Sequence, residues 1–380
     1  MAPTPAPRSV DGVARTLLAP LLDGRLAASG WRVINWDAEQ GICVTLERGT
    51  TCLLIELEGR NDQLDCYART ARFNVCVRRQ FDDRPLDDAD RELVDAVVAM
   101  VGRREGRLPA GARAAATRPT QVREVLVDRV LMSEGRDQYY INPYVGCMIA
   151  CPYCYVIDRA DFSRGLEGQP QLPWGRYLDV KVNAAEVLRR EIAGGRRGVV
   201  RMSPIVTDPY QPAERRYRIT RQCLEVLLDS ELAPVVLTRA PRILEDVPLL
   251  ARFRRALVGF SIPTDQDRYR QIFEPDADPI DARLDALRQV HAAGIGAFAV
   301  IQPILPMDPE RLVDAVAPYV RAVRIDRLYV GERVRHLYEQ HDLSAFAGDD
   351  YVDDALARLA QGFQARGVVV NALDDLAALL

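Results

Sequence analysis

Three cysteines lie close together in the middle of this 380-residue sequence, in the run Cys147-Met-Ile-Ala-Cys151-Pro-Tyr-Cys154. Thiolates are soft, anionic ligands that suit iron–sulfur clusters. Three of them at C-x3-C-x2-C spacing can hold one cubane cluster and leave its fourth iron open to a substrate or cofactor. Gly146 and Pro152 suit a loop that turns tightly around an inorganic core. The sequence therefore predicts an iron–sulfur site with these three cysteines as its ligands.

A zinc site, or simply three buried thiols, is the alternative interpretation of this run. Zinc sites favour paired C-x2-C knuckles or a nearby histidine. The histidines of the chain, His291, His336 and His341, are all remote in sequence. The four cysteines before residue 80 lack C-x2-C spacing, and Cys223 lies in a helical segment where a core thiol is expected.

Composition narrows the class of protein. Lysine and arginine total 50 against 54 acids, so the net charge of −4 gives no sign of a general nucleic-acid binder. Arginines gather between Arg103 and Arg129, where a solvated linker is the expected structure. The single lysine, Lys181, leaves one candidate for Schiff-base chemistry. No stretch approaches the roughly 20 apolar residues of a membrane span, and the N-terminus has no signal-like apolar region, so we expect a cytoplasmic protein.

Residues 1–103 are predicted to form a small N-terminal α+β domain. An apolar helix is expected around Leu17–Ala28 and a second helix over 87–103, which begins with acids as a helix N-terminus prefers. Between them, short segments at 41–48, 51–58, 63–71 and 74–81 are separated by turn residues and predict an antiparallel meander. Residues 104–121 are the predicted linker.

The alternation within these segments gives the predicted sheet two different faces. One face is apolar and is expected to be a core. The other is polar but carries thiols, which rarely sit in open solvent, so we expect it to cover the mouth of the second domain or to bind substrate. The apolar face comprises Ile42, Val44, Leu46, Leu53, Ile55, Leu57, Cys66, Val75 and Val77, and the polar face Cys43, Thr45, Glu47, Cys52, Glu56, Tyr67, Arg69, Cys76 and Arg78.

Residues 122–335 read as alternating strands and helices, followed by a C-terminal α/β extension over 336–380. Such repeats predict a parallel sheet with right-handed crossovers, and six of them fit a partial (β/α)6 barrel. The fold class is therefore α/β. Strands are predicted at 137–145, 198–206, 234–238, 256–262, 297–303 and 324–330, and helices at 183–194, 216–230, 243–253, 279–293 and 309–321.

In an α/β barrel the working side chains lie at the C-terminal ends of the strands. This rule selects six polar residues for the predicted site, independently of any relative. They are Thr207 and Asp208 after the second strand, Thr238 and Arg239 after the third, Ser261 after the fourth and Gln302 after the fifth.

The segment Tyr140-Ile-Asn-Pro-Tyr-Val-Gly-Cys-Met-Ile-Ala-Cys-Pro-Tyr-Cys-Tyr155 resembles the cluster loop of the radical S-adenosylmethionine (SAM) superfamily, in the branch related to spore photoproduct lyase. The resemblance continues through Asp179-Val-Lys-Val-Asn183, Thr207-Asp-Pro-Tyr-Gln-Pro-Ala-Glu214, Phe260-Ser261-Ile262 and Pro303-Ile-Leu-Pro306. It covers roughly residues 122–330 and nothing before them.

The resemblance implies an enzyme with two cofactors, a [4Fe-4S] cluster and SAM. In the family, SAM binds the open iron, and one electron cleaves it to methionine and a 5′-deoxyadenosyl radical that abstracts a hydrogen atom from the substrate. Reduced flavodoxin or ferredoxin is the implied electron donor. The cofactors carry the chemistry, while the protein places and shields them.

The resemblance also assigns roles. Thr207, Arg239 and Ser261 match positions that hold SAM, and the planar fork of Arg239 suits the methionine carboxylate. Tyr153 and Gln302 are the other predicted cofactor contacts. Tyr155, whose partner in a tyrosine pair is Tyr153, and Asp208 are the predicted catalytic residues, with packing and helix capping as their alternative roles.

Two departures from the lyase pattern bear on the substrate. The lyase's hydrogen-donating cysteine has no counterpart, since Ile205 and Val206 stand at the matching positions, and Met148-Ile149-Ala150 replace a histidine common in the loop. A peptide, small metabolite or natural-product intermediate is therefore the expected substrate. A nucleic-acid repair or modification enzyme is the second interpretation, and a non-catalytic iron–sulfur or zinc module is the third.

Overall fold

The computed structural model of the chain describes residues 30–37, 42–48, 51–59, 67–69, 73–80, 86–105, 120–135, 137–157, 160–161, 164, 169, 172–203, 206–328, 331–371 and 379–380. The helix predicted around Leu17–Ala28, and residues 106–119 of the predicted linker, lie outside the described residues. On either side of that gap, helix α3 ends at Glu105 and strand β6 begins at Gln121.

The N-terminal sheet is antiparallel, and its strand order is β1-β2-β3-β5-β4. The predicted core face is buried at Val44, Leu46, Leu53 and Ile55, which pair across strands β2 and β3 as Val44↔Ile55 and Leu46↔Leu53. Strand β1 was not predicted, and the simple meander is wrong at one point, because β3 pairs with β5 while β4 adds only a short outer edge. The strands are β1 (Arg32–Asp37), β2 (Ile42–Arg48), β3 (Thr51–Gly59), β4 (Ala68–Arg69) and β5 (Phe73–Gln80).

Helix α3 (Asp88–Glu105) follows this sheet and confirms the helix predicted over 87–103. Its first turn is acidic, and two aspartates exchange side-chain to backbone hydrogen bonds there. The amide of Asp90 donates to Asp87 Oδ1, and the amide of Asp87 donates to Asp90 Oδ2, both at 3.0 Å. This reciprocal arrangement satisfies backbone donors that a helix start otherwise leaves free. Leu93 and Val94 of the helix are buried.

The second part of the chain is an α/β partial barrel, as the sequence predicts. Its eight-stranded sheet has the order β16-β15-β14-β13-β12-β11-β8-β7, and all neighbours from β8 to β16 are parallel, while β7 is antiparallel to β8. Each of the six predicted strand regions contributes a strand to it. The strands are β7 (Met132–Gly135), β8 (Gln138–Tyr140), β11 (Arg197–Met202), β12 (Glu231–Thr238), β13 (Leu257–Ser261), β14 (Gly296–Ile301), β15 (Ala322–Ile325) and β16 (Val369–Val370).

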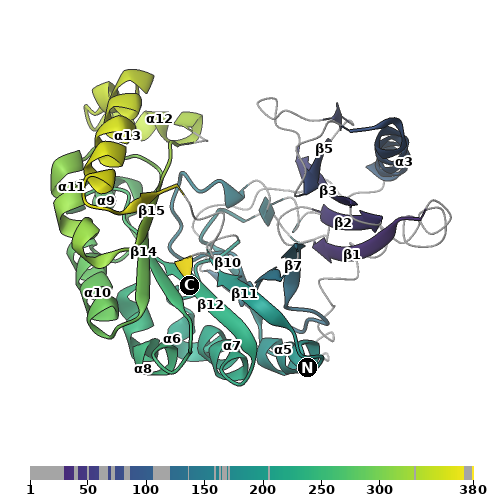
Figure 1. The fold of residues 1–380 in the computed structure, drawn as a ribbon. Coiled ribbons are helices and arrows are strands. Elements are labelled where there is room, and N and C mark those ends of the chain that lie inside the picture. Colours follow the sequence, from purple (N-terminus) through teal and green to yellow (C-terminus); the bar gives the residue numbers. More distant parts are fainter. Residues whose placement is uncertain are drawn as a thin grey trace, which may run out of the picture.

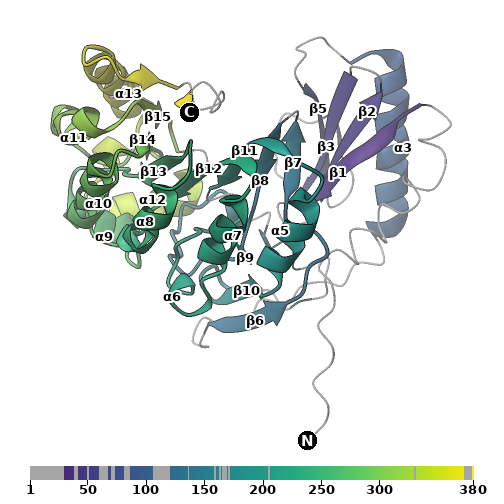
Figure 2. The same ribbon diagram turned by 60° about the horizontal axis from the view of Figure 1, so that its bottom comes forward.

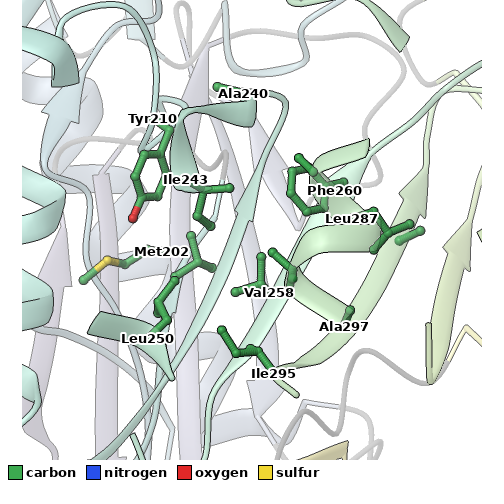
Figure 3. Packing of buried hydrophobic residues seen from close by; sticks show 14 of the residues in the cluster. Met202, Tyr210, Ala240, Ile243, Leu250, Val258, Phe260, Leu287, Ile295 and Ala297 are labelled. Atoms are coloured by element: carbon green, nitrogen blue, oxygen red, sulfur yellow. The ribbon is translucent and has the colours of Figure 1, made fainter. Parts of the chain in front are cut away.

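Helices cover the outer side of this curved sheet (Figure 1). Apolar side chains of the strands and helices meet there in the main core, of which Figure 3 shows Met202, Ile243, Val258, Phe260 and Leu287. The helices are α5 (Ala184–Ile192), α6 (Glu214–Tyr217), α7 (Ile219–Leu227), α8 (Val247–Leu250), α9 (Asp267–Phe273), α10 (Ile280–Ala292), α11 (Pro309–Val316), α12 (Gly331–Gln340) and α13 (Asp349–Gln364), and the 3-10 turns are Pro241–Asp246, Ala317–Tyr319 and Ser344–Phe346.

Three predicted elements are interrupted. The strand predicted at 137–145 divides into β8 and β9 (Tyr144–Val145), which belong to different sheets, because Pro143 between them has no N–H for a ladder. The helix predicted at 216–230 breaks at Arg218, whose φ is 53°. The helix predicted at 243–253 is a 3-10 turn followed by the short α8, which carries a proline in its first turn.

A small third sheet, β6-β10-β9, holds the start of the cysteine run (Figure 2). Strand β10 (Tyr177–Lys181) lies between β6 (Gln121–Val125) and β9, parallel to the first and antiparallel to the second. Arg123 of β6 donates to the Asp179 carboxylate from Nε at 2.8 Å and from Nη2 at 2.5 Å. This sheet fixes the backbone that leads into Cys147.

The C-terminal elements are continuous with the barrel. Helix α12 crosses the predicted boundary at 335/336, and β16 pairs with β15, so residues beyond 336 complete the same sheet. Among the described residues, no helix combines the length and the apolar character that crossing a membrane requires.

Candidate functional site

A cavity of about 240 Å³ lies at the C-terminal ends of the barrel strands and against the cysteine run. Its walls come from the loop at 147–156, from β11 to β15 and from the residues that follow these strands. Thr238 is buried beside Asp208 and does not line the cavity. All the other residues predicted for the site line it. These residues are Cys147, Cys151, Tyr153, Cys154, Tyr155, Thr207, Asp208, Arg239, Ser261 and Gln302.

The cysteine loop turns tightly because two glycines allow close backbone contacts. Gly146 has a φ of +95°, and a Cβ at this position would lie 2.6 Å from the carbonyl oxygen of Tyr177. Gly175 has a φ of +83°, and its Cβ would lie 2.4 Å from that of Ala150. Within the loop, the amide of Ala150 donates to the carbonyl of Cys147 at 3.2 Å. Larger residues at either glycine would displace the loop.

Burial raises the pKa of all three loop thiols. The pKa of Cys147 rises to about 12, with the nearby Asp208 carboxylate as a second cause. Burial also raises the pKa of Cys151 and of Cys154, while the positive charge of Arg239 lowers it in both cases. The three thiols are soft ligands that lie buried beside the positive charge of Arg239. This environment suits a metal group that binds them as thiolates.

The placement of the three thiols bears on the kind of metal group that they could hold. In the part of the chain that the structure describes, no three His, Cys, Asp or Glu side chains converge as the ligands of a single ion do. The three thiols instead line one wall of the cavity. A cubane takes each thiolate on a different iron, so its ligands lie further apart than those around one zinc ion.

Thr207 and Gln211 tie the cysteine loop to the end of β11. The Thr207 hydroxyl donates to the carbonyl of Gly146 at 2.7 Å, and Gln211 Nε2 donates to the same oxygen at 3.1 Å. Gln211 Oε1 accepts from the amide of Met148 at 2.8 Å. Thr207 thus holds the loop as well as lining the cavity. Gln211 was not predicted, although it is the next fully buried polar side chain of the Thr207–Glu214 segment after Asp208.

Asp208 is buried and links the end of β11 to the end of β12. Its Oδ1 accepts from the Thr238 hydroxyl at 2.5 Å and from the amide of Tyr210 at 2.9 Å, and its Oδ2 accepts from the amide of Arg239 at 2.8 Å. Burial raises the pKa of this carboxyl, and the three hydrogen bonds oppose that rise. The contacts assign Asp208 a positioning role, and its predicted catalytic role stays a prediction.

Arg239 follows β12, the strand next to β11, and its side chain is held by a buried acid. Its Nε donates to Glu274 Oε1 at 2.8 Å, and its side chain is 14% exposed. The hydroxyl of Tyr153 donates to the same carboxylate oxygen. Tyr153 is therefore committed to Glu274. Arg239 lines the cavity, and its one side-chain hydrogen bond among the described residues is made by Nε. Sequence inspection missed Glu274, because it follows α9 and lies far along the chain from both partners.

Ser261 and Gln302 complete the polar wall. Ser261 is 2% exposed, and among the described residues its Oγ has no hydrogen-bond partner. A buried hydroxyl without a partner is costly, so a polar ligand in the cavity would satisfy it. Tyr155 is 47% exposed and lies at the rim. The arginines Arg201, Arg324 and Arg327, which were not predicted, also line the cavity.

Glu214 and Tyr210 lie outside the cavity lining and support the fold. The Glu214 carboxylate accepts hydrogen bonds from the Tyr144 hydroxyl and from the backbone amides of Thr220 and Arg221. The two amides lie at the start of α7, and each of their bonds is 3.1 Å long. The Tyr210 hydroxyl donates to Asp246 at 2.9 Å. The bonds from the two amides mean that Glu214 caps the start of α7.

The N-terminal sheet contacts the barrel at its edge, where β1 lies against β7. None of the described residues between 30 and 105 lines the cavity. The contact at β7 therefore differs from the lid that the mixed face of this sheet predicts. Cys76 on that face is partly buried, and the side chains of Cys43 and Cys52 lie outside the described part.

Comparison with known proteins finds one family that the barrel is similar to. Residues 141–317 match the Radical SAM superfamily. This part of the chain, a little under half of its length, is similar to the radical SAM domain. The match begins between β8 and β9, ahead of the cysteine loop, and ends directly after α11, so it contains nearly all of the residues that line the cavity.

The chain also resembles individual proteins. An uncharacterized protein of Methanocaldococcus jannaschii is 28% identical over 209 residues, which are 54% of this chain and 76% of that protein. A protein of Pseudomonas phage M6, described as a radical SAM Nalpha-GlyT isomerase, is 27% identical over 43% of this chain, which spans only 33% of the phage protein. A spore photoproduct lyase complexed with dinucleoside spore photoproduct superposes with a TM-score of 0.45 at 16% identity, over 65% of this chain and 81% of the lyase.

Proposed function

We propose that the chain is a radical SAM enzyme that binds a [4Fe-4S] cluster through Cys147, Cys151 and Cys154 and binds SAM in the adjoining cavity. The observation that carries the proposal is that three thiols, the arginine Arg239 and a serine hydroxyl without a partner among the described residues line one cavity. When bound, the cluster and SAM supply hydrogen-atom abstraction, driven by one electron from a donor such as reduced flavodoxin or ferredoxin.

The chain's own residues bind and orient these groups. The terminal nitrogens of Arg239 suit the methionine carboxylate of SAM, since a guanidinium binds a carboxylate in a paired, charge-assisted way. The Ser261 hydroxyl offers a donor and an acceptor for a polar part of SAM, and Gln302 adds an amide. Thr207 and Gln211 hold the loop in place. Val235, Leu237, Phe298 and Val300 give the cavity an apolar wall that excludes water.

Within this proposal the substrate is a peptide, small metabolite or natural-product intermediate. The cavity must take SAM as well as the reacting part of the substrate, so we infer that a small molecule or one side chain enters at a time. The described lining holds four arginines, Arg201, Arg239, Arg324 and Arg327, and one carboxylate, Asp208. Acids outside the lining offset part of this positive charge, because Arg324 pairs with Asp326 and Arg327 pairs with Asp349 and Asp353.

A nucleic-acid substrate is the second candidate, because arginine side chains of the cavity lining suit a phosphate group. A base would have to leave the stack to reach so enclosed a site. Binding of DNA or RNA that weakens steeply with salt would support this candidate over the first.

Anaerobic reconstitution with iron and sulfide, followed by reduction and addition of SAM, tests the proposal. The expected products are methionine and 5′-deoxyadenosine, measured by liquid chromatography with mass detection, and their yield should rise with the true substrate. A protein that takes up iron yet never cleaves SAM is a non-catalytic iron–sulfur module, and that result would overturn the proposal.

A further inference from the structure

A buried ion network lies behind the cavity and centres on Glu274, the residue that follows α9. Glu274 is fully buried and does not line the cavity. Its Oε1 accepts from Arg239 Nε at 2.8 Å and from the hydroxyl of Tyr153, and its Oε2 lies 2.6 Å from Arg283 Nη2. One carboxylate therefore joins the cysteine loop, the end of β12 and helix α10.

Arg283 extends this network to a fourth element. The guanidinium is fully buried, and its Nη1 donates to the carbonyl of Ser261 at 3.0 Å, while its Nε donates to the carbonyl of Asp278 at 2.9 Å. Ser261 is the residue whose hydroxyl faces the cavity without a partner among the described residues. The network thus fixes the backbone of Ser261 and the side chain of Arg239 together.

The charges of the network leave one positive charge for the cavity. Burial raises the pKa of Glu274, but the guanidinium groups of Arg283 and Arg239 outweigh it and hold the pKa at about 2, so the group is ionised. Two guanidiniums then share one carboxylate. Among the described residues, Arg239 donates hydrogen bonds only from its backbone amide and its Nε, so neither terminal nitrogen has a partner there. Burying an unpaired charge is unfavourable, so an anion bound in the cavity would neutralise the remaining positive charge of the network.

We propose that Glu274 is a positioning residue that, braced by Arg283, fixes the guanidinium of Arg239 so that its terminal nitrogens bind the carboxylate of SAM. This inference rests on the proposed function of the cavity. A free arginine side chain samples many rotamers, whereas one held at Nε presents its two outer N–H groups in a single direction. Such bracing lowers the ordering cost of binding, and so it raises affinity without a direct contact to the ligand.

The test is the affinity of the reconstituted, cluster-loaded full chain for SAM, measured by titration under anaerobic conditions. Glu274→Gln keeps the shape of the side chain but removes its charge. We expect its dissociation constant for SAM to rise about 10-fold, which corresponds to ~1.4 kcal/mol, with an unchanged iron content. The matched control is Asp267→Asn, an acid-to-amide change at the start of the same helix. Asp267 pairs with Arg270 and does not line the cavity, so SAM affinity should stay at the wild-type value.

A double-mutant cycle separates positioning from general damage. If Glu274 acts through Arg239, Glu274→Gln should change SAM affinity less than about 2-fold in an Arg239→Met background. Equal losses in both backgrounds would overturn the inference, as would wild-type affinity in the single variant. If the wild-type chain itself fails to bind or cleave SAM, it is the proposed function that fails.

Glu274→Gln leaves two buried guanidiniums without a carboxylate, which is destabilising. If the variant does not fold, the charge-balanced pair Glu274→Gln with Arg283→Gln takes its place. This pair removes one charge of each sign and is expected to show the same loss of SAM affinity. Wild-type affinity in the folded pair would overturn the inference. A further readout is the electron paramagnetic resonance spectrum of the reduced cluster, which SAM should perturb in the variant only at raised concentration.

Discussion

At the scale of single residues, the three loop cysteines line the same cavity but differ in how far they are exposed. Cys147 and Cys151 are buried, and Cys154 is partly buried. We expect Cys147→Ala, Cys151→Ala and Cys154→Ala each to lose most of the iron and sulfide after reconstitution, because a cubane needs all three thiolates for stable binding. Iron and sulfide assays, together with the visible absorption of the cluster, measure this.

Cys223 provides the matched control for the loop cysteines. It is fully buried in α7 and belongs to the main core, away from the cavity. Cys223→Ala should keep the iron and lower stability by about 1 kcal/mol, as the loss of a small buried group does. Full iron content in any of the loop variants would contradict the assignment of the ligands.

Arg239 is the residue on which the proposed SAM site depends most. Arg239→Ala should weaken SAM binding by roughly 1.5–3 kcal/mol, the usual value of a charge-assisted hydrogen bond, and leave the cluster in place. The protein should fold, since Glu274 keeps Arg283 as a neutralising partner. Calorimetric titration with SAM checks the affinity. Arg221→Ala is the control, because Arg221 pairs with Asp246 outside the cavity lining, and an equal loss there would show a non-specific effect.

Glu214 gives the stability of the fold a predictable pH dependence. Burial raises its pKa from 4.5 to about 7, although hydrogen bonds from Tyr144, Arg221 and Thr220 oppose the rise. A raised pKa means that the folded state binds the proton more tightly than the unfolded state. The stability that this proton contributes is fully present below pH 4.5 and is lost as pH rises through about 7.

The measurement compares the wild-type chain with Glu214→Gln, which cannot titrate. The unfolding temperature of the wild type relative to the variant should fall as pH rises from about 4.5 to about 7, and should then level off. A difference that stays constant over this range would mean that Glu214 is ionised throughout it.

At the scale of elements, the cysteine loop depends on glycine more than on its own hydrogen bonds. Gly146→Ala should destabilise the protein by more than the ~1–2 kcal/mol of a left-handed alanine, because its Cβ would also lie 2.6 Å from a backbone oxygen. Gly294→Ala separates the two effects. Gly294 has a φ of +76°, but nothing lies within 4 Å of a Cβ there, so only the conformational cost applies. Thermal unfolding and iron retention compare them, and equal effects on both would rule out the contact.

The barrel strands were predictable because each is a short apolar run between a helix and a loop, and such runs leave few alternatives in a parallel sheet. The interruptions were not predictable by periodicity. Arg218 adopts a left-handed conformation where the apolar pattern continues, because the Glu214 carboxylate caps a new helix start at Thr220 and Arg221. That contact depends on tertiary placement, which a local pattern does not contain.

The same distinction applies to the site. Strand-end polar residues such as Thr207, Arg239 and Ser261 were found because parallel strands bring their C-terminal ends to one edge. Gln211 and Glu274 were missed because each acts across a long sequence separation, to Gly146 and to Tyr153 respectively. Sequence thus predicted the residues that face the cavity, but not those that hold them from behind.

At the scale of the whole molecule, the C-terminal elements support the cysteine loop from outside the matched domain. A separate hydrophobic cluster joins Cys147, Ile149 and Tyr153 of the loop to Phe273 of α9 and to Tyr338 of α12. The rings of Phe273 and Tyr338 lie 4.6 Å apart. Arg333 of α12 also donates from Nη1 to the carbonyl of Cys154 at 2.8 Å. Helix α12 therefore packs behind the loop that is proposed to hold the cluster.

This packing predicts that damage to α12 affects the cluster more than equal damage elsewhere. Tyr338→Ala should lower stability by roughly 3–5 kcal/mol, as the loss of a buried aromatic ring does, and should also speed the release of iron from the reconstituted protein. Phe363→Ala is the matched control, because Phe363 is a fully buried ring of α13 in the main core. Both variants should unfold at lower temperature, whereas iron release to a chelator, followed well below either transition, should accelerate only for Tyr338→Ala. Equal acceleration in the two variants would mean that the C-terminal helices protect the cluster only through the stability of the whole fold.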